Sequence, residues 1–354
     1  MTIMLDWLTA TLIGSRAGPA CGQWYGGPIL DRHRAFTRRP PGGRRQRHLP
    51  CLRMSFMLSF LPAPLLGFIV GTLLIANTVL HAIVILLFSP LKLLALLAPP
   101  LAPAVRRTMA AFQENWTALN GGIFRLLPRI DWDIRGLDGL RRDQWYFVVA
   151  NHQCWVDILA VFHALNRRVP PLKIFIKQEL LYVPVVGLAV YALDYPFMKR
   201  YSKELLAKKP QLRGKDLETT RAACAKYQGY PVSVMSYLEG TRITPGKHAA
   251  TASPYRHLLR PKSAGAAFVL SALGTRMESL LDMTIAYPDG IPSFWDFCRG
   301  RVRRIIIEVS VREIPAHFCL SSYENDEAYR NEFQSWVGSL WADKDNRLDA
   351  LLRS

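Results

Sequence analysis

The chain has 354 residues, half of them hydrophobic, and a formal net charge of +18. The charge favours anionic partners, and since no nucleic-acid-binding motif accompanies it while a long apolar segment does, we expect lipid and no nucleic acid. The six cysteines are scattered without metal-ligand spacing or a disulfide pattern, so we expect no metal and a reducing compartment.

Residues 1–53 form a basic N-terminal extension with nine arginines and little hydrophobic periodicity. Such a stretch cannot bury a core, so we expect it to be disordered. It also lacks the order of a signal peptide, because its charge follows its apolar start. One interpretation is a mis-called translation start with Met54 as the native one. The other is a basic arm that touches anionic lipid.

Residues 54–108 are interpreted as a membrane-anchoring segment. No Asp, Glu, Lys or Arg occurs from Ser55 to Leu91, and Leu65–Phe88 would measure about 36 Å as a helix, enough to cross a bilayer. We therefore predict an N-terminal transmembrane helix. Pro62, Pro64 and Gly71 keep a re-entrant hairpin open as the alternative.

The Pro-rich stretch from Leu91 to Val105 is short and apolar, so it is interpreted as an interfacial segment. Lys92, Arg106 and Arg107 follow the apolar helix. If residues 1–53 are absent from the native protein, this positive charge places the following domain on the cytoplasmic side.

Residues 109–354 show the pattern of an α/β domain. Apolar runs predict strands at 145–150, 172–176, 232–238, 283–287 and 302–311, with helical patterns between them. The clearest internal helix is Asp216–Tyr227, and a tail from about 323 to 352 is amphipathic. We expect a single mixed sheet with flanking helices.

The first of these strands is followed by a candidate general base. His152 and Asp157 are five residues apart, and on one ideal helix their side chains would not share a face. They can pair if His152 lies in the turn and Asp157 in the first helical turn. The carboxylate would then hold one imidazole nitrogen and leave the other as a base. Backbone amides at the start of that helix are candidate oxyanion donors.

The third predicted strand ends in Glu239-Gly240-Thr241-Arg242. Gly240 permits a tight backbone path, and Arg242 offers a planar fork of donors suited to phosphate. A structural ion pair between Glu239 and Arg242 is the alternative. Cys154, two residues past His152, offers a thiol nucleophile as a minor alternative.

Together these motifs resemble those of the glycerolphosphate acyltransferase family, which includes the 1-acylglycerol-3-phosphate acyltransferases. The resemblance spans roughly residues 120–310 and rests on the Asn-His-x-x-x-x-Asp block, on Glu-Gly-Thr-Arg, and on two segments between them. Those segments contain Lys177 and Arg200. The sequences of Phe197–Ser202 and Tyr287–Gly290 are similar to those of the YihG-type bacterial branch of this family. Asp194 departs from the family, which usually has glycine there.

The resemblance implies direct acyl transfer without a protein nucleophile. It makes His152 the base and Asp157 its orienting partner. It implies that the following residues bind substrate: Asn151, Lys177, Arg200, Glu239, Gly240, Thr241 and Arg242. No cofactor is expected, because the acyl donor is a co-substrate, either acyl-CoA or acyl carrier protein.

The implied acceptor is a lysophospholipid, most simply 1-acyl-sn-glycerol-3-phosphate, which would give phosphatidic acid. A lysophosphodiester such as lysophosphatidylglycerol or lysophosphatidylinositol is the alternative. A lipid hydrolase and an inactive scaffold are further alternatives. With the apolar helix, the resemblance implies an enzyme bound to the bacterial inner membrane, with its catalytic domain facing the cytoplasm.

Overall fold

The computed structural model describes residues 58, 60–128, 130–198, 218, 222–227, 229–277, 279–320 and 326–354. Three predictions lie wholly or partly outside this range: the nature of residues 1–53, the position of Arg200, and the first half of the helix Asp216–Tyr227.

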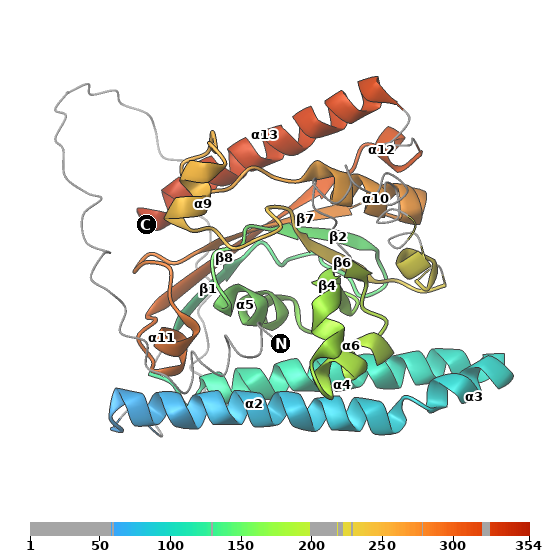
Figure 1. The fold of residues 1–354 in the computed structure, drawn as a ribbon, viewed down its shortest axis with the longest axis horizontal. Coiled ribbons are helices and arrows are strands. Elements are labelled where there is room, and N and C mark those ends of the chain that lie inside the picture. The colour runs from blue at the N-terminus through green and yellow to red at the C-terminus, as the bar shows by residue number, and fades with distance from the viewer. Residues whose placement is uncertain are drawn as a thin grey trace, which may run out of the picture.

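The centre of the molecule is a six-stranded mixed sheet with the strand order β1-β8-β7-β2-β6-β3 (Figure 1). Its strands are β1 (Asp131–Arg135), β2 (Tyr146–Ala150), β3 (Leu172–Ile174), β6 (Ser233–Tyr237), β7 (Ser279–Ala286) and β8 (Arg304–Glu313). β7 and β8 are antiparallel, and all other neighbours are parallel. A separate pair joins β4 (Ile176–Lys177) to β5 (Phe197–Met198). The predicted α/β fold on a mixed sheet is confirmed.

Helices cover both faces of this sheet (Figure 1). Alternate residues of β2 point to opposite faces, so Val148 joins one core cluster and Val149 the other. The Val148 face is covered by α2 (Ala63–Phe88), α4 (Ala102–Phe124), α5 (Val156–Leu165) and α11 (Phe294–Cys298). The Val149 face is covered by α10 (Ser263–Leu273), α12 (His317–Leu320) and α13 (Glu327–Leu352). Shorter elements are α3 (Leu91–Leu97), η1 (Pro99–Leu101), η2 (Gln178–Tyr182), α6 (Val186–Ala192), α9 (Pro245–Ala250) and η4 (Gly274–Arg276).

The N-terminal helix α2 lies close to the bounds expected for it. In the part of the chain that the structure describes, one helical stretch, Ala63–Leu97, is long and apolar enough to cross a membrane by length and composition. One side of α2 packs on the domain, where Asn77 Nδ2 donates to Asn120 Oδ1 of α4 at 2.8 Å. Figure 1 shows α2 and α4 side by side beneath the sheet. α4 also runs through the expected domain boundary after residue 108, so the apolar segment shares its core with the domain.

Parallel pairing brings three strand ends to one edge of the sheet. Ala150, the last residue of β2, is in register with Tyr237 of β6 and with Met283 of β7. The segments that follow β2 and β6 and the end of β7 therefore meet at the carboxyl edge, where open α/β sheets commonly bind ligands. Those segments carry the His152 and Glu239 motifs.

Candidate active site

His152 and Asp157 form the predicted pair. His152 lies in the loop after β2, and Asp157 lies in the first turn of α5. The distance from His152 Nδ1 to Asp157 Oδ2 is 2.9 Å. Because an ionised carboxylate only accepts hydrogen bonds, Nδ1 carries the proton and Nε2 keeps a lone pair. Among the residues that the structure describes, none hydrogen-bonds to Nε2, and the side chain is 15% exposed.

The Asp157 carboxylate is fully buried and held by several further donors. Oδ2 also accepts from the backbone N–H of Gln153 at 2.5 Å and of Cys154 at 2.8 Å. Oδ1 accepts from the Tyr287 hydroxyl at 2.6 Å. This fixes the carboxylate and, through it, the ring of His152. The amides of Gln153 and Cys154 are therefore occupied, and the amides at the start of α5 stay the predicted oxyanion donors.

Tyr237 fixes the plane of the imidazole. Its ring stacks on that of His152, with centroids 4.0 Å apart and an interplanar angle of 15°. Tyr237 is the last residue of β6, so the strand that leads into the Glu239 motif also covers one face of the His152 ring. The ring can turn little, because Asp157 holds one edge and Tyr237 covers one face.

Glu239 joins the two motif loops through the backbone. Its Oε1 accepts from the N–H of His152 at 3.0 Å, and its Oε2 accepts from the N–H of Leu259 at 3.2 Å. The N–H of Ile243 donates in return to the main-chain oxygen of His152 at 3.0 Å. Burial raises the pKa of Glu239 to about 8, and the two N–H groups oppose that rise. The sequence predicts a substrate contact for Glu239, whereas the structure uses both of its oxygens as anchors.

Asn151 is another motif residue with an anchoring position. Its Nδ2 donates to the main-chain oxygen of Ile285 in β7, and its Oδ1 accepts from the N–H of the same residue, both at 2.9 Å. The side chain is completely buried. Asn151 therefore links the His152 loop to β7, and its contact with substrate stays a prediction.

The rest of the Glu239 motif forms an open cationic loop. Gly240 has a φ of +70°, a conformation in which glycine carries no steric cost. The Arg242 guanidinium lies 4.6 Å from the centre of the Trp155 ring, instead of pairing with Glu239. Lys247, in α9, donates to Thr241 Oγ1 at 2.8 Å and to the main-chain oxygen of Arg242 at 3.1 Å. Two cations thus lie on the loop that is tied to His152.

The remaining predicted residues are placed less centrally. Lys177 is exposed in β4, in the small two-stranded sheet. Asp194 has a φ of +59°, which explains why glycine suits this position in the family. Its carboxylate pairs with Lys92 of α3 at 2.5 Å and with Lys226 at 3.9 Å. Asp194 therefore ties α3 to the domain.

Cys154 is inside the motif but is a poor nucleophile. Burial first, and then the neighbouring Asp157 charge, raise the pKa of its thiol well above the ordinary value. A thiolate is the reactive form of cysteine, and this environment suppresses it. The arrangement leaves His152 Nε2 as the reactive group of this loop.

Sequence reasoning missed Tyr237, Tyr287 and Lys247. Tyr287 is 130 residues from Asp157 in the chain, so no local spacing connects them. Lys247 had a usable signal, because Thr244 and Pro245 are typical of a helix start and place it one turn inside a helix.

The fold and the His152–Asp157 pair define an acyltransferase-type domain, and comparison with known proteins agrees. Residues 131–286 match the family model described as Acyltransferase. This part of the chain therefore matches the acyltransferase family, in agreement with the motifs.

Two relatives of known class are similar to part of this chain. The chain is 24% identical over 279 residues to lysocardiolipin acyltransferase 1 of Danio rerio, an alignment that covers 75% of this chain and 66% of the relative. It is 26% identical over 211 residues to human 1-acyl-sn-glycerol-3-phosphate acyltransferase gamma, covering 56% of this chain and 51% of the relative. The matched region thus spans about half to two thirds of these relatives.

A solved structure is also similar. The crystal structure of the 1-acyl-sn-glycerophosphate acyltransferase PlsC from Thermotoga maritima matches with a TM-score of 0.46 and 16% sequence identity. The match covers 78% of this chain and 95% of that chain.

Proposed function

We propose that the protein is a membrane-bound acyltransferase that moves a fatty acyl group from a thioester donor to the free hydroxyl of a lysophospholipid. The observation that carries this proposal is the buried Asp157 that holds His152 Nδ1 while Nε2 has no partner in the described chain. Such a pair removes a proton from an external group rather than from a protein nucleophile.

The proposed reaction is a single transfer. His152 Nε2 takes the proton of the acceptor hydroxyl, whose oxygen attacks the thioester carbonyl carbon. Asp157 stabilises the imidazolium that forms, as the aspartate does in Ser–His–Asp enzymes. The carbon–sulfur bond then breaks, and the leaving thiolate takes the proton from the imidazolium. The donor is acyl-CoA or acyl carrier protein.

The proposed acceptor is 1-acyl-sn-glycerol-3-phosphate, with phosphatidic acid as the product. Arg242 and Lys247 support it, because a phosphomonoester with nearly two negative charges gains most from neighbouring cations. A lysophosphodiester is the second candidate, because lysocardiolipin acyltransferase 1 is among the similar proteins. With Asp194 in ion pairs to two lysines, that candidate has no support from a free Asp194 carboxylate.

Membrane attachment through α2 and α3 is part of the proposal. Their outward-facing apolar side chains are exposed, among them Leu73, Leu80, Leu87, Leu96 and Leu97. Because the other side of α2 packs on the domain, this stripe is the part of the helix that can enter lipid. We place the protein at a bacterial inner membrane with the domain on the cytoplasmic side. Extraction by detergent but not by salt or carbonate supports the attachment, and release by salt alone contradicts it.

An acyl-transfer assay tests the function. The full chain is purified in detergent and supplied with radiolabelled palmitoyl-CoA and one acceptor at a time: lysophosphatidic acid, lysophosphatidylglycerol, lysophosphatidylinositol or lysocardiolipin. Labelled phospholipid supports transfer, whereas labelled free fatty acid alone indicates a hydrolase. A tenfold higher kcat/KM for a phosphodiester, about 1.4 kcal/mol in transition-state binding, would replace the proposed acceptor.

A further inference from the structure

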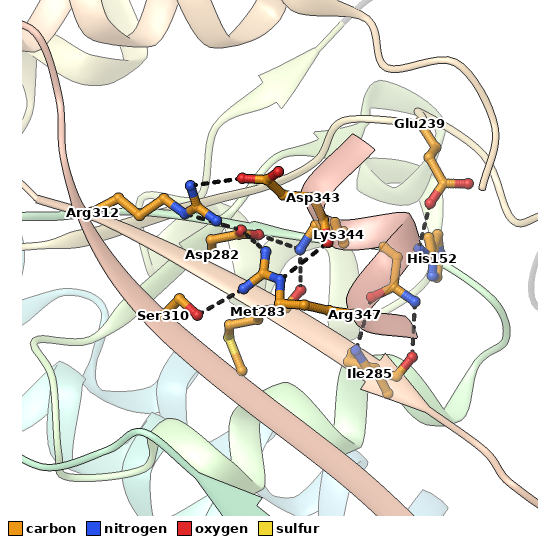
Figure 2. A network of polar contacts seen from close by, with 11 residues as sticks. His152, Glu239, Asp282, Met283, Ile285, Ser310, Arg312, Asp343, Lys344 and Arg347 are labelled. Carbon is orange, nitrogen blue, oxygen red and sulfur yellow. Dashed lines mark hydrogen bonds and ion pairs between the residues drawn. The ribbon is translucent and has the colours of Figure 1, made fainter. Parts of the chain in front are cut away.

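The C-terminal helix α13 carries a completely buried lysine. Lys344 Nζ forms an ion pair with Asp282 of β7 and donates a 2.5 Å hydrogen bond to the main-chain oxygen of Met283 (Figure 2). Arg347, one turn later, pairs with the other oxygen of Asp282 and donates to Ser310 Oγ of β8 at 2.7 Å. α13 lies beyond residues 131–286, the segment that matches the family.

Stability alone does not account for this buried charge. Removing a charged pair from water costs several kcal/mol per ion, and well-packed apolar replacements are often as stable or more so. α13 already has an apolar face that packs on the sheet, with Phe333, Val337, Leu340, Trp341 and Leu348. A lysine within that apolar face therefore has another function than stabilising the packing of α13.

Lys344 touches β7 at the level of the candidate base. Its hydrogen-bond acceptor, Met283, is in register with Ala150, the last residue of β2. Asn151 and His152 follow directly, and Asn151 exchanges two hydrogen bonds with Ile285, two residues beyond Met283. Lys344 therefore holds β7 next to the point where the His152 loop is attached.

Lys344 also acts on the second attachment of that loop. Burial raises the pKa of Glu239, and the charge of Lys344 is among the influences that lower it. Glu239 in turn raises the pKa of Lys344, against the effect of burial. Glu239 accepts more strongly from the N–H groups of His152 and Leu259 when it is ionised, the form that predominates above its pKa of about 8. The ammonium of Lys344 favours that ionised form.

We infer that Lys344 is a positioning residue for His152, acting from behind the sheet through Met283 and Asp282 of β7 and through Glu239. Figure 2 shows Lys344 and Asp282 near Met283, with Ile285, Glu239 and His152 on the other side of Lys344. The inference rests on the proposed function for its kinetic consequence, and its structural consequence is independent of activity.

The kinetic test uses Lys344→Met in the full chain, below the melting temperature of each variant. We expect kcat to fall by at least about tenfold while the acceptor KM changes by less than about threefold, because alignment is lost rather than binding. The matched control is Asp349→Asn, which removes an α13 carboxylate paired with Arg256 and His257 away from β7. Its kcat should stay within about twofold of the wild type.

A double-variant cycle separates positioning from general loosening. If Lys344 acts partly through Glu239, the losses of kcat in Lys344→Met and Glu239→Gln should overlap in the double variant instead of multiplying. Full multiplication of the two losses, with folded protein, contradicts the Glu239 part of the inference.

Hydrogen exchange supplies the readout that does not need activity. In Lys344→Met, amides at 151–157 and 258–260 should exchange faster than those of β8, whereas Asp349→Asn should leave those at 151–157 unchanged. If the wild type transfers no acyl group, the proposed function fails and this measurement still decides the inference. If Lys344→Met does not fold, Lys344→Gln replaces it, since it keeps a donor for Met283 without the charge. Unchanged exchange and kcat, uniform acceleration, or failure of both variants to fold overturns the inference.

Discussion

Replacing Asp157 with asparagine tests the proposed base most directly. Its Oδ2 accepts from His152 Nδ1, Gln153 N and Cys154 N, so the side-chain amide nitrogen of asparagine cannot take that place. It can take the place of Oδ1, because the Tyr287 hydroxyl can reverse and accept. The substitution therefore keeps the geometry and removes the charge that stabilises the imidazolium.

Two magnitudes follow from these contacts. Three hydrogen bonds to Oδ2 lose a charged acceptor and keep a neutral one, and each weakens by about 1 kcal/mol. The free energy of unfolding should therefore fall by about 3 kcal/mol and the Tm by roughly 6–12 °C. The effect on kcat should be larger, between about 10²- and 10⁴-fold, which is the range that a positioned general base contributes.

The assay is acyl transfer at a temperature where circular dichroism shows the Asp157→Asn protein to be folded. Mass spectrometry confirms the unmodified sequence and excludes deamidation back to aspartate. A kcat within about threefold of the wild type in that protein would refute the base-and-orienter mechanism. A loss of activity that simply follows the unfolded fraction would make Asp157 a folding residue instead.

Three further predictions concern residues around the pair. Burial raises the pKa of Glu239 from 4.5 to about 8, so between these pH values the folded state keeps a proton that the unfolded state loses. The free energy of unfolding, measured by urea denaturation, should therefore fall as the pH rises from about 4.5 to 8. Glu239→Gln should reduce this dependence on pH. Cys154→Ala should keep kcat within about threefold, and a large loss in folded protein would return the thiol to the mechanism. Arg242→Ala should raise the acceptor KM by about tenfold or more and Arg242→Lys by less, whereas a raised donor KM alone would assign Arg242 to the donor.

The local part of the site could be predicted from the sequence, because five residues between a strand and a helix leave His152 and Asp157 few ways to meet. The partners that hold the pair could not. Strand pairing brings these partners to the loop from far along the chain. Glu239 is 87 residues from His152, and Ile285 is 134 residues from Asn151. Tyr287 approaches Asp157 over 130 residues.

Motif membership also did not reveal which way a polar group faces. Asn151 and Glu239 belong to the motifs, but their polar atoms bond to backbone, which one-dimensional spacing does not distinguish from substrate binding. The strand β1 was missed because Asp131–Arg135 alternates charged and apolar residues at an edge of the sheet and is only half-buried. Short edge strands carry a weak apolar signal. The similarity to one bacterial branch stays a prediction.

The packing of α2 has a consequence for biosynthesis. α2 ends at Phe88, but α11, against which it packs, begins at Phe294, about 200 residues later. At ribosomal rates of 5–20 residues per second, roughly 10–40 s separate their synthesis. α4 and α6 are made earlier and can cover other parts of α2, but during that interval the part around Gly67 and Gly71, which meets Trp295 and Cys298 in the folded protein, lacks its partner. A lipid bilayer is the apolar surface that can cover this part of α2 until α11 is made.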